Sequence, residues 1–250
     1  DVSHLRHHAD VGIEVAQGRG ALRAWADVRS GQVVGGTADL ALADVNTTLA
    51  ADLRPLVLPS IQGRLGGRRL TGGFEFSTQA LQFQTDDGLT WPGGNLRLVH
   101  TDANGKAPAQ GELRADRLDL AALAQVASRL PLGAAAHDAL RTYTPEGLVD
   151  EIQATWKGPL DALQQYQVKG RIQGLALAGA TDGATPAHLG LRGANVDIDM
   201  TQAGGKAALT MASGALVLPG VFEEPVLPLD RLSADVRWQV DGGRIAVPAD

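Results

Sequence analysis

A chain of 250 residues with 44% hydrophobic and 20% charged side chains has the composition of a folded protein, which excludes wholesale disorder. The formal net charge of −6, without a cluster of Lys and Arg interleaved with aromatic residues, disfavours nucleic acid as a partner. Cysteine is absent, which excludes disulfides and thiolate chemistry, and no run of about 18 apolar residues predicts a membrane-spanning helix.

The N-terminal stretch contains three histidines, His4, His7 and His8. On a helix, His4 and His8 would share a face, but no acidic ligand or general base lies between them as zinc-protease patterns require. We interpret them as a solvated cluster and predict no metal site.

From Val33 the sequence alternates between apolar and polar residues, which predicts β-strands. Pro55 and Pro59 cannot donate ladder hydrogen bonds, so residues 54–59 are predicted to form an edge or connecting segment before a strand at Ile61.

Two further strands are predicted over residues 70–77 and 81–85, and Asp86-Asp87-Gly88 predicts the hairpin turn that follows. Asp86 and Asp87 are adjacent at the tip of this turn, so we interpret them as solvated turn residues rather than an acid/base pair. Asn104-Gly105 predicts another turn.

Helical periodicity is concentrated after Asp119, where Leu120, Leu123, Ala127 and Leu130 form one apolar stripe. Asp119 is the predicted N-cap. The first helix is predicted to stop at Pro131, and a second short helix to cover roughly residues 134–141. Residues 119–147 are a candidate repeat boundary, a helical insertion in what is otherwise one continuous segment over residues 1–250.

The period of two returns after Gly147, where Leu148, Ile152, Ala154 and Trp156 are predicted to share one face of a strand. Further on, Asn195, Asp197 and Asp199 have a calcium-loop spacing but lack the glycine and distal glutamate of such loops. We interpret these three as the solvated face of a strand.

About a dozen strands and two to three short helices are predicted in total. Each helix covers about two strands, so most of the apolar face needs another partner. A membrane barrel is disfavoured because aromatic residues make up only 4% of the chain. A closed sandwich stays open as an alternative, but it predicts bulky residues throughout its inner face, whereas glycines such as Gly63 and Gly170 fall within strands and favour curvature. The predicted fold is mostly β: a long, strongly twisted antiparallel sheet curled into an open groove.

Short phrases along most of the chain resemble the AsmA-like superfamily of bacterial envelope proteins, most closely its YhdP branch. The phrases are Asp52-Leu53-Arg54-Pro55-Leu56, Asp87-Gly88-Leu89-Thr90-Trp91, Leu118-Asp119-Leu120-Ala121-Ala122-Leu123, Pro145-Glu146-Gly147 with Trp156-Lys157-Gly158, Tyr166, Gly193, Ser213 to Pro219 with Phe222 and Pro225, and Trp238. Thr185-Pro186-Ala187-His188 departs from the pattern, where Pro-Gly is expected.

The resemblance implies a fragment of a longer protein that is anchored in the inner membrane by a helix outside this sequence and lies in the periplasm. It implies the transport of phospholipids between the inner and outer membranes through an apolar groove. Phospholipid acyl chains and the two membranes are then the partners. The resemblance supplies no catalytic residue and no cofactor.

A conduit for lipid needs continuous apolar lining, because one buried 16-carbon chain is worth on the order of 12 kcal/mol at about 0.8 kcal/mol per methylene. We predict that the lining consists of the apolar positions of four strands: Ile152, Trp156, Val168, Ile172, Val196, Ile198, Met200, Val236 and Trp238. The opposite faces are predicted to meet water: Gln153, Lys169, Arg171, Asp197, Asp199 and Arg237.

Two alternatives remain open at the level of sequence. One is a β-rich structural or adhesion module of the envelope without lipid cargo. The other is an enzyme, which we do not expect, because His100, His137 and His188 have no acid or nucleophile at a recognisable spacing.

Overall fold

The structure is a computed structural model that describes residues 14–49, 53–130, 134–159, 162–180, 188–241 and 244–246. Its strands are β1 (Glu14–Arg29), β2 (Gln32–Thr48), β3 (Leu56–Leu70), β4 (Gly73–Gln84), β5 (Thr90–Trp91), β6 (Leu96–Thr101), β7 (Gln110–Asp119), β8 (Glu146–Lys157), β9 (Gln165–Leu177), β10 (Gly190–Thr201), β11 (Gly204–Val217), β12 (Val226–Asp241) and β13 (Arg244–Ala246). Its helices are α1 (Leu120–Val126), the 3-10 helix η2 (Ala127–Arg129) and α2 (Ala134–Tyr143).

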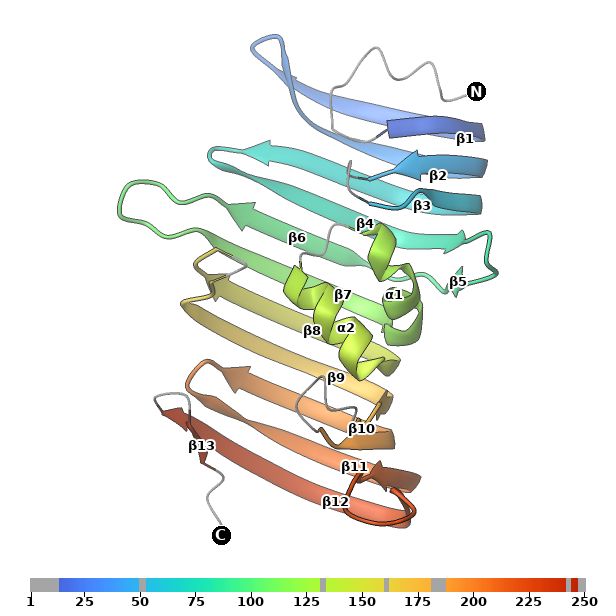
Figure 1. The fold of residues 1–250 in the computed structure, drawn as a ribbon. Helices are drawn as coiled ribbons and strands as arrows, with labels where there is room; N and C mark the ends of the chain where they lie inside the picture. The colour runs from blue at the N-terminus through green and yellow to red at the C-terminus, as the bar shows by residue number, and fades with distance from the viewer. Residues whose placement is uncertain are drawn as a thin grey trace.

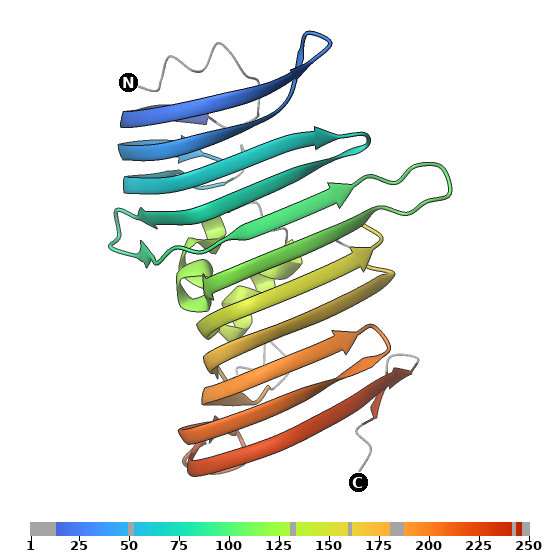
Figure 2. The ribbon, with the colours of Figure 1, turned by 180° about the vertical axis from the view of Figure 1, so that it is seen from behind.

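All the described strands belong to one antiparallel sheet, in which neighbours in space are almost always neighbours in sequence. The order runs from β1 to β13, and only the short β5 leaves this path by pairing with β4. The end strands β1 and β13 do not pair with each other, so the sheet is open (Figures 1 and 2). The predicted open, curled antiparallel sheet with short helices is therefore confirmed.

The helices lie together on one face of the sheet, in front of its middle strands in Figure 1 and behind them in Figure 2. Asp119 caps α1 as predicted: its backbone is extended and its carboxylate accepts a hydrogen bond from the backbone N–H of Ala122, 2.9 Å away. The first helix tightens into η2 and ends at Arg129, and α2 extends two residues beyond the predicted end.

The turns that rest on glycine are also confirmed. Gly88, with a φ of 87°, donates its backbone N–H to the carbonyl oxygen of Thr85 in the β4–β5 turn. Asn104 bridges to Ala107 across Gly105, which has a φ of 59°.

Strand β1 precedes the predicted start of the sheet at Val33. On one face of β1, Gly20, Ala24 and Ala26 pair with residues of β2. Their side chains are small or absent, so β1 shows little hydrophobic periodicity in the sequence. His4, His7 and His8 lie outside the described residues.

The prediction of an edge or connecting segment at residues 54–59 is right only in part, because β3 already begins at Leu56, where it pairs with β2 but not yet with β4. Leu56 and Leu58 pair with β2 and are buried. Pro59 faces Asp44, which has a φ of 54° and forms no ladder pair, and β4 pairs with β3 only from Ser60 onward. The missing N–H of Pro59 therefore interrupts no ladder.

The strands predicted over residues 70–77 and 81–85 are divided differently in the structure. A turn at residues 71 and 72 separates Leu70, at the end of β3, from β4. The change of phase within β4 comes from a bulge near Ala80, which has a φ of 47°, and not from a break between two strands.

A second bulge corrects the predicted face of β8. The register shifts between Val149 and Glu151, so Val149 pairs with Ile172 and is only 3% exposed. The side chain of Val149 therefore lies on the face of β8 that simple alternation assigned to Leu148.

Candidate functional site

Cross-strand pairing assembles one continuous apolar face from most of the sheet. Directly opposed residues of antiparallel strands point to the same side, so a chain of pairs identifies a face. One row of such pairs crosses eight strands from β4 to β12: Phe76, Leu98, Leu113, Ala154, Val168, Met200, Gly205 and Trp238. A parallel row crosses nine: Leu65, Thr78, Leu96, Ala115, Ile152, Gly170, Ile198, Ala207 and Val236. We call this surface the apolar face.

All the residues predicted to line a groove fall on this face. Trp156 pairs with Tyr166 in one row, and Ile172 pairs with Val196 in another. The remaining predicted lining residues belong to the two long rows. Four strands were considered from the sequence, and the register extends the same surface to β3, β4, β6, β7 and β11.

Much of the apolar face is open. Phe74, Phe76 and Val236 are 45%, 38% and 38% exposed, although their side chains are large and apolar. A single sheet leaves such residues uncovered, and a contiguous exposed apolar surface of this kind indicates a binding surface.

The helices lie over a part of the apolar face, near the ends of β7 and β9 and the start of β8. Ala122 and Val126 of α1 are buried against Leu89, with the stacked rings of Phe83 and Trp91 beside them. A separate buried cluster lies on β9, β10 and β11, and Leu120 of α1 packs against it: Leu175, Ala194, Val196 and Met211. The helices therefore close one margin of the face and leave the opposite margin open.

The opposite surface, which we call the polar face, is covered by paired charges. Arg171 contacts Asp197 at 2.8 Å and Lys169 contacts Asp199 at 3.2 Å, each across β9 and β10. Asn195, on the same strand, accepts a hydrogen bond from the backbone N–H of Gly174. The interpretation of Asn195, Asp197 and Asp199 as the solvated face of a strand is confirmed, since Asn195 is exposed and the side chains of Asp197 and Asp199 are 62% and 33% exposed.

The same pattern recurs at the other end of the sheet. Arg64 bonds Asp39 at 2.6 Å, and this hydrogen bond holds the pKa of Asp39 below its usual value. Hydrogen bonds from Arg68 and then Arg97 likewise hold the pKa of Glu75 below its ordinary range.

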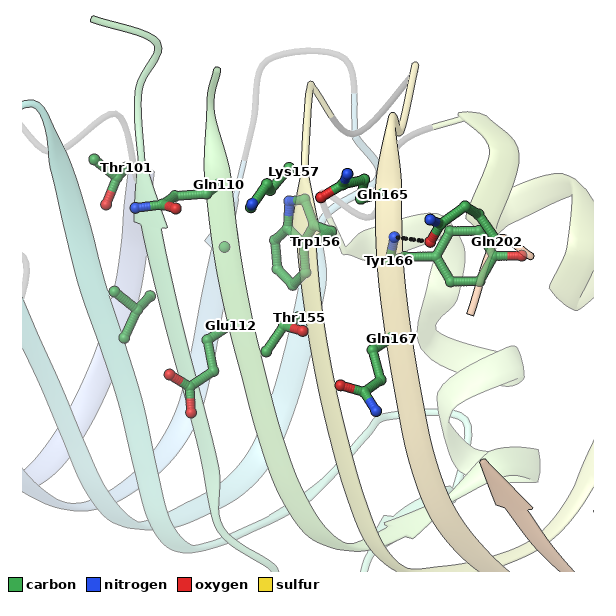
Figure 3. A pocket seen from close by; sticks show the side chains of 12 residues that line it. Thr101, Gln110, Glu112, Thr155, Trp156, Lys157, Gln165, Tyr166, Gln167 and Gln202 are labelled. Atoms are coloured by element: carbon green, nitrogen blue, oxygen red, sulfur yellow. Dashed lines mark hydrogen bonds between the residues drawn. The ribbon is translucent and has the colours of Figure 1, made fainter. Parts of the chain in front are cut away.

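Hollows in the structure lie mainly on the polar face and gather no reactive groups. The hollow in Figure 3, about 580 Å³, is bordered by Glu112, Thr155 and Gln167 in one cross-strand row and by Gln110 and Lys157 in the next. It contains no histidine and no cysteine. In the described part of the chain, no group of three or more His, Cys, Asp or Glu side chains is placed to hold a metal ion.

Asp87 has a structural role that the sequence did not reveal. Its carboxylate accepts hydrogen bonds from the Thr85 hydroxyl and from the guanidinium of Arg129, 3.0 Å away, and both lower its pKa. The β4–β5 turn is thereby tied to η2. The lowered pKa favours the ionised form of Asp87, and this carboxylate holds the helices to the turn through Arg129. We therefore interpret Asp87 as a structural residue and not as half of an acid/base pair.

The described histidines are also engaged in structure. His137 Nε2 lies 2.9 Å from the carbonyl oxygen of Ala127 and so joins α2 to η2. The ring of His188 meets Tyr143 edge-on, and His100 Nε2 lies 3.4 Å from Asp102.

A family model described as YhdP protein matches residues 2–249. The chain belongs to the YhdP family. It is accordingly an AsmA-like bacterial envelope protein, from a transport and structural family rather than a family of enzymes. Comparisons of this YhdP-family chain with curated proteins and with solved structures returned no match. Among its described residues, no helix is both long and apolar enough to span a bilayer.

Proposed function

We propose that this YhdP-family segment carries phospholipids between the inner and outer membranes, with acyl chains held on the apolar face. In this proposal the full-length protein is held in the inner membrane and spans the periplasm. The polar face meets water, and the helices shield one margin of the path.

The observation that carries the proposal is the unbroken apolar row from β4 to β12. Adjacent strands are about 4.8 Å apart, so an acyl chain that moves across the sheet meets apolar side chains at every step. Exposing an acyl chain to water costs about 0.8 kcal/mol per methylene, so a break in the apolar lining would create a large free-energy barrier to lipid movement. Twelve strands at this spacing extend about 50 Å, more than the roughly 30 Å hydrocarbon core of a bilayer.

Two neighbouring residues of β12 allow a direct test. Val236 lies on the apolar face and is 38% exposed, and Arg237 lies next to it on the polar face and is also exposed. Because both positions are accessible, a difference in lipid crosslinking between them shows which face binds lipid and does not reflect a difference in burial. A photo-crosslinking amino acid at position 236 of the full-length protein, in cells, is expected to capture phospholipid, and the same group at position 237 is not.

A functional assay completes the test. Val236→Asp places a carboxylate in the path of the acyl chains and is expected to block transport, since a charge is costly to desolvate, whereas Arg237→Asp should transport normally. Lipid captured at position 237 but not at 236 would reverse the assignment of the faces. Capture at neither position in a folded protein would contradict the lipid conduit and favour the structural module without cargo.

A further inference from the structure

One margin of the apolar face has a different chemistry from the rest. A row of cross-strand partners crosses β3, β4, β6, β7, β8 and β9 beside their turns, at the strand ends opposite the helices: Arg69, Phe74, His100, Gly111, Trp156 and Tyr166. We call these residues the rim row. Arg69, His100, Trp156 and Tyr166 each join an apolar body to a polar atom.

Over β4–β9, the row next to the rim row lacks such atoms. The next row toward the helices contains Phe76, Leu98, Leu113, Ala154 and Val168. Beyond it, the face ends in the buried Leu175 cluster under α1. Over β4–β9 the apolar face is therefore polarised, with amphipathic side chains in the rim row and apolar ones in the row next to it.

Trp156 is held flat within the rim row. Its indole lies over Gly111, where a Cβ atom would come within 2.1 Å of the ring, so only glycine leaves room for it. In the described structure its indole N–H is shielded from solvent and has no hydrogen-bond partner. Trp238 adopts a similar position over Gly205 on β11.

Side chains of this kind gather where the polar and apolar parts of a lipid layer meet. Trp and Tyr are enriched at membrane interfaces because one end of each ring is apolar and the other forms hydrogen bonds. Arg extends an apolar stem toward a charged end that binds phosphate. Phe74, 45% exposed and 5.6 Å from the His100 ring, gives the same margin an open apolar surface.

Building on the proposed function, we propose that the rim row fixes the orientation of the bound phospholipid. The phosphate and ester oxygens lie along the row from Arg69 to Tyr166, as acceptors for Arg69, His100 and the Tyr166 hydroxyl, with the Trp156 ring beneath them. The acyl chains run from there toward Ile172 and the helices. From Tyr166 to Ile172 is about 20 Å of strand, enough for an acyl chain that fills half of a bilayer core, about 15 Å.

The reverse orientation would bury a charged head group among Val126, Val149 and Leu175, where no solvent reaches it. Asp102 lies beside His100 at the rim, so an anionic phosphate is expected nearer to Arg69 than to the His100–Asp102 pair.

Two photoreactive phosphatidylethanolamines distinguish the orientations in the purified full-length protein. One carries a diazirine on the head group, and the other carries it at the end of an acyl chain. Labelled peptides are mapped by mass spectrometry. The head-group probe is expected to label peptides with His100, Trp156 and Tyr166 several-fold more than those with Ile172 and Val196, and the chain-end probe is expected to show the opposite preference.

A reversed preference, or the same distribution for both probes, would overturn the orientation while leaving the conduit intact. Labelling by neither probe would contradict the proposed function itself. As a matched pair of variants, Trp156→Leu is expected to spread the head-group labelling over the face, and Thr155→Leu, its exposed neighbour on the polar face, is expected to leave it at the rim. An unchanged head-group map in Trp156→Leu and in Tyr166→Leu would also overturn the role of the rim row.

Discussion

Glu75 lies between two arginines on the polar face, 2.6 Å from Arg68 and 2.8 Å from Arg97, with its side chain 17% exposed. Because these hydrogen bonds lower its folded pKa, Glu75 stabilises the fold above its unfolded pKa near 4.5, and that stability is lost as pH falls through the lower folded value. Glu75→Gln is expected to reduce the free energy of unfolding at pH 7 by about 1 kcal/mol. Urea unfolding at several pH values measures this.

The deficit of Glu75→Gln should disappear in acid, where the wild-type carboxylate is protonated as well. Glu151→Gln, on an exposed stretch of β8, is the control and should change stability less. A deficit of the same size at pH 7 and below pH 3 would show that the ion pairs are not its cause.

Gly111 and Gly67, two of the glycines on the apolar face, differ in what lies above them. A methyl group at Gly111 would collide with the Trp156 ring, whereas one at Gly67 meets nothing within 4 Å, and neither glycine has a positive φ. Gly111→Ala is expected to displace the indole, shift tryptophan emission and cost about 1–3 kcal/mol, and Gly67→Ala should stay within about 0.5 kcal/mol. Equal effects in thermal unfolding would contradict the packing of Trp156 over Gly111.

At the scale of elements, α1 depends on its cap because it has only seven residues. Asp119→Ala removes the acceptor for the Ala122 N–H and is expected to cost about 1 kcal/mol, whereas Asp119→Asn should retain most of the stability. Hydrogen exchange over residues 120–129 should rise in the alanine variant. Asp138→Ala, which breaks only the exposed pair with Arg141 on α2, is the control, and faster exchange in that variant alone would contradict the role of the cap.

At the scale of the whole molecule, the sheet is a series of local pairings with separate buried clusters. Val45, Leu56 and Leu58 form one cluster, and the Leu175 cluster lies several strands away. Stability in such an arrangement is a sum of neighbouring contacts. Val45→Ala is therefore expected to cost about 0.5–2 kcal/mol and to raise hydrogen exchange in β1–β4, but not in β9–β12. Exchange raised equally in both regions would show a single cooperative unit instead.

Local chemistry let the sequence predict the strands of the second half, the turn at Gly88 and the cap at Asp119. A period of two predicts which side chains share a face of a strand, and turn and cap residues act on backbone groups only two or three positions away. The nine residues predicted to share a face do so because the stretches that carry them alternate without interruption.

The tertiary structure decided the features that depend on a partner strand. Bulges at Ala80 and between Val149 and Glu151 reverse the phase of β4 and β8, and a shift of one residue exchanges the two faces of a strand. Pro59 is tolerated in β3 because Asp44 forms no ladder pair opposite it and β4 pairs with β3 only from Ser60 onward. The rim row exists only through register, because Arg69 and Tyr166 are far apart in sequence and are joined by pairs across six strands, each set by the packing of its neighbours.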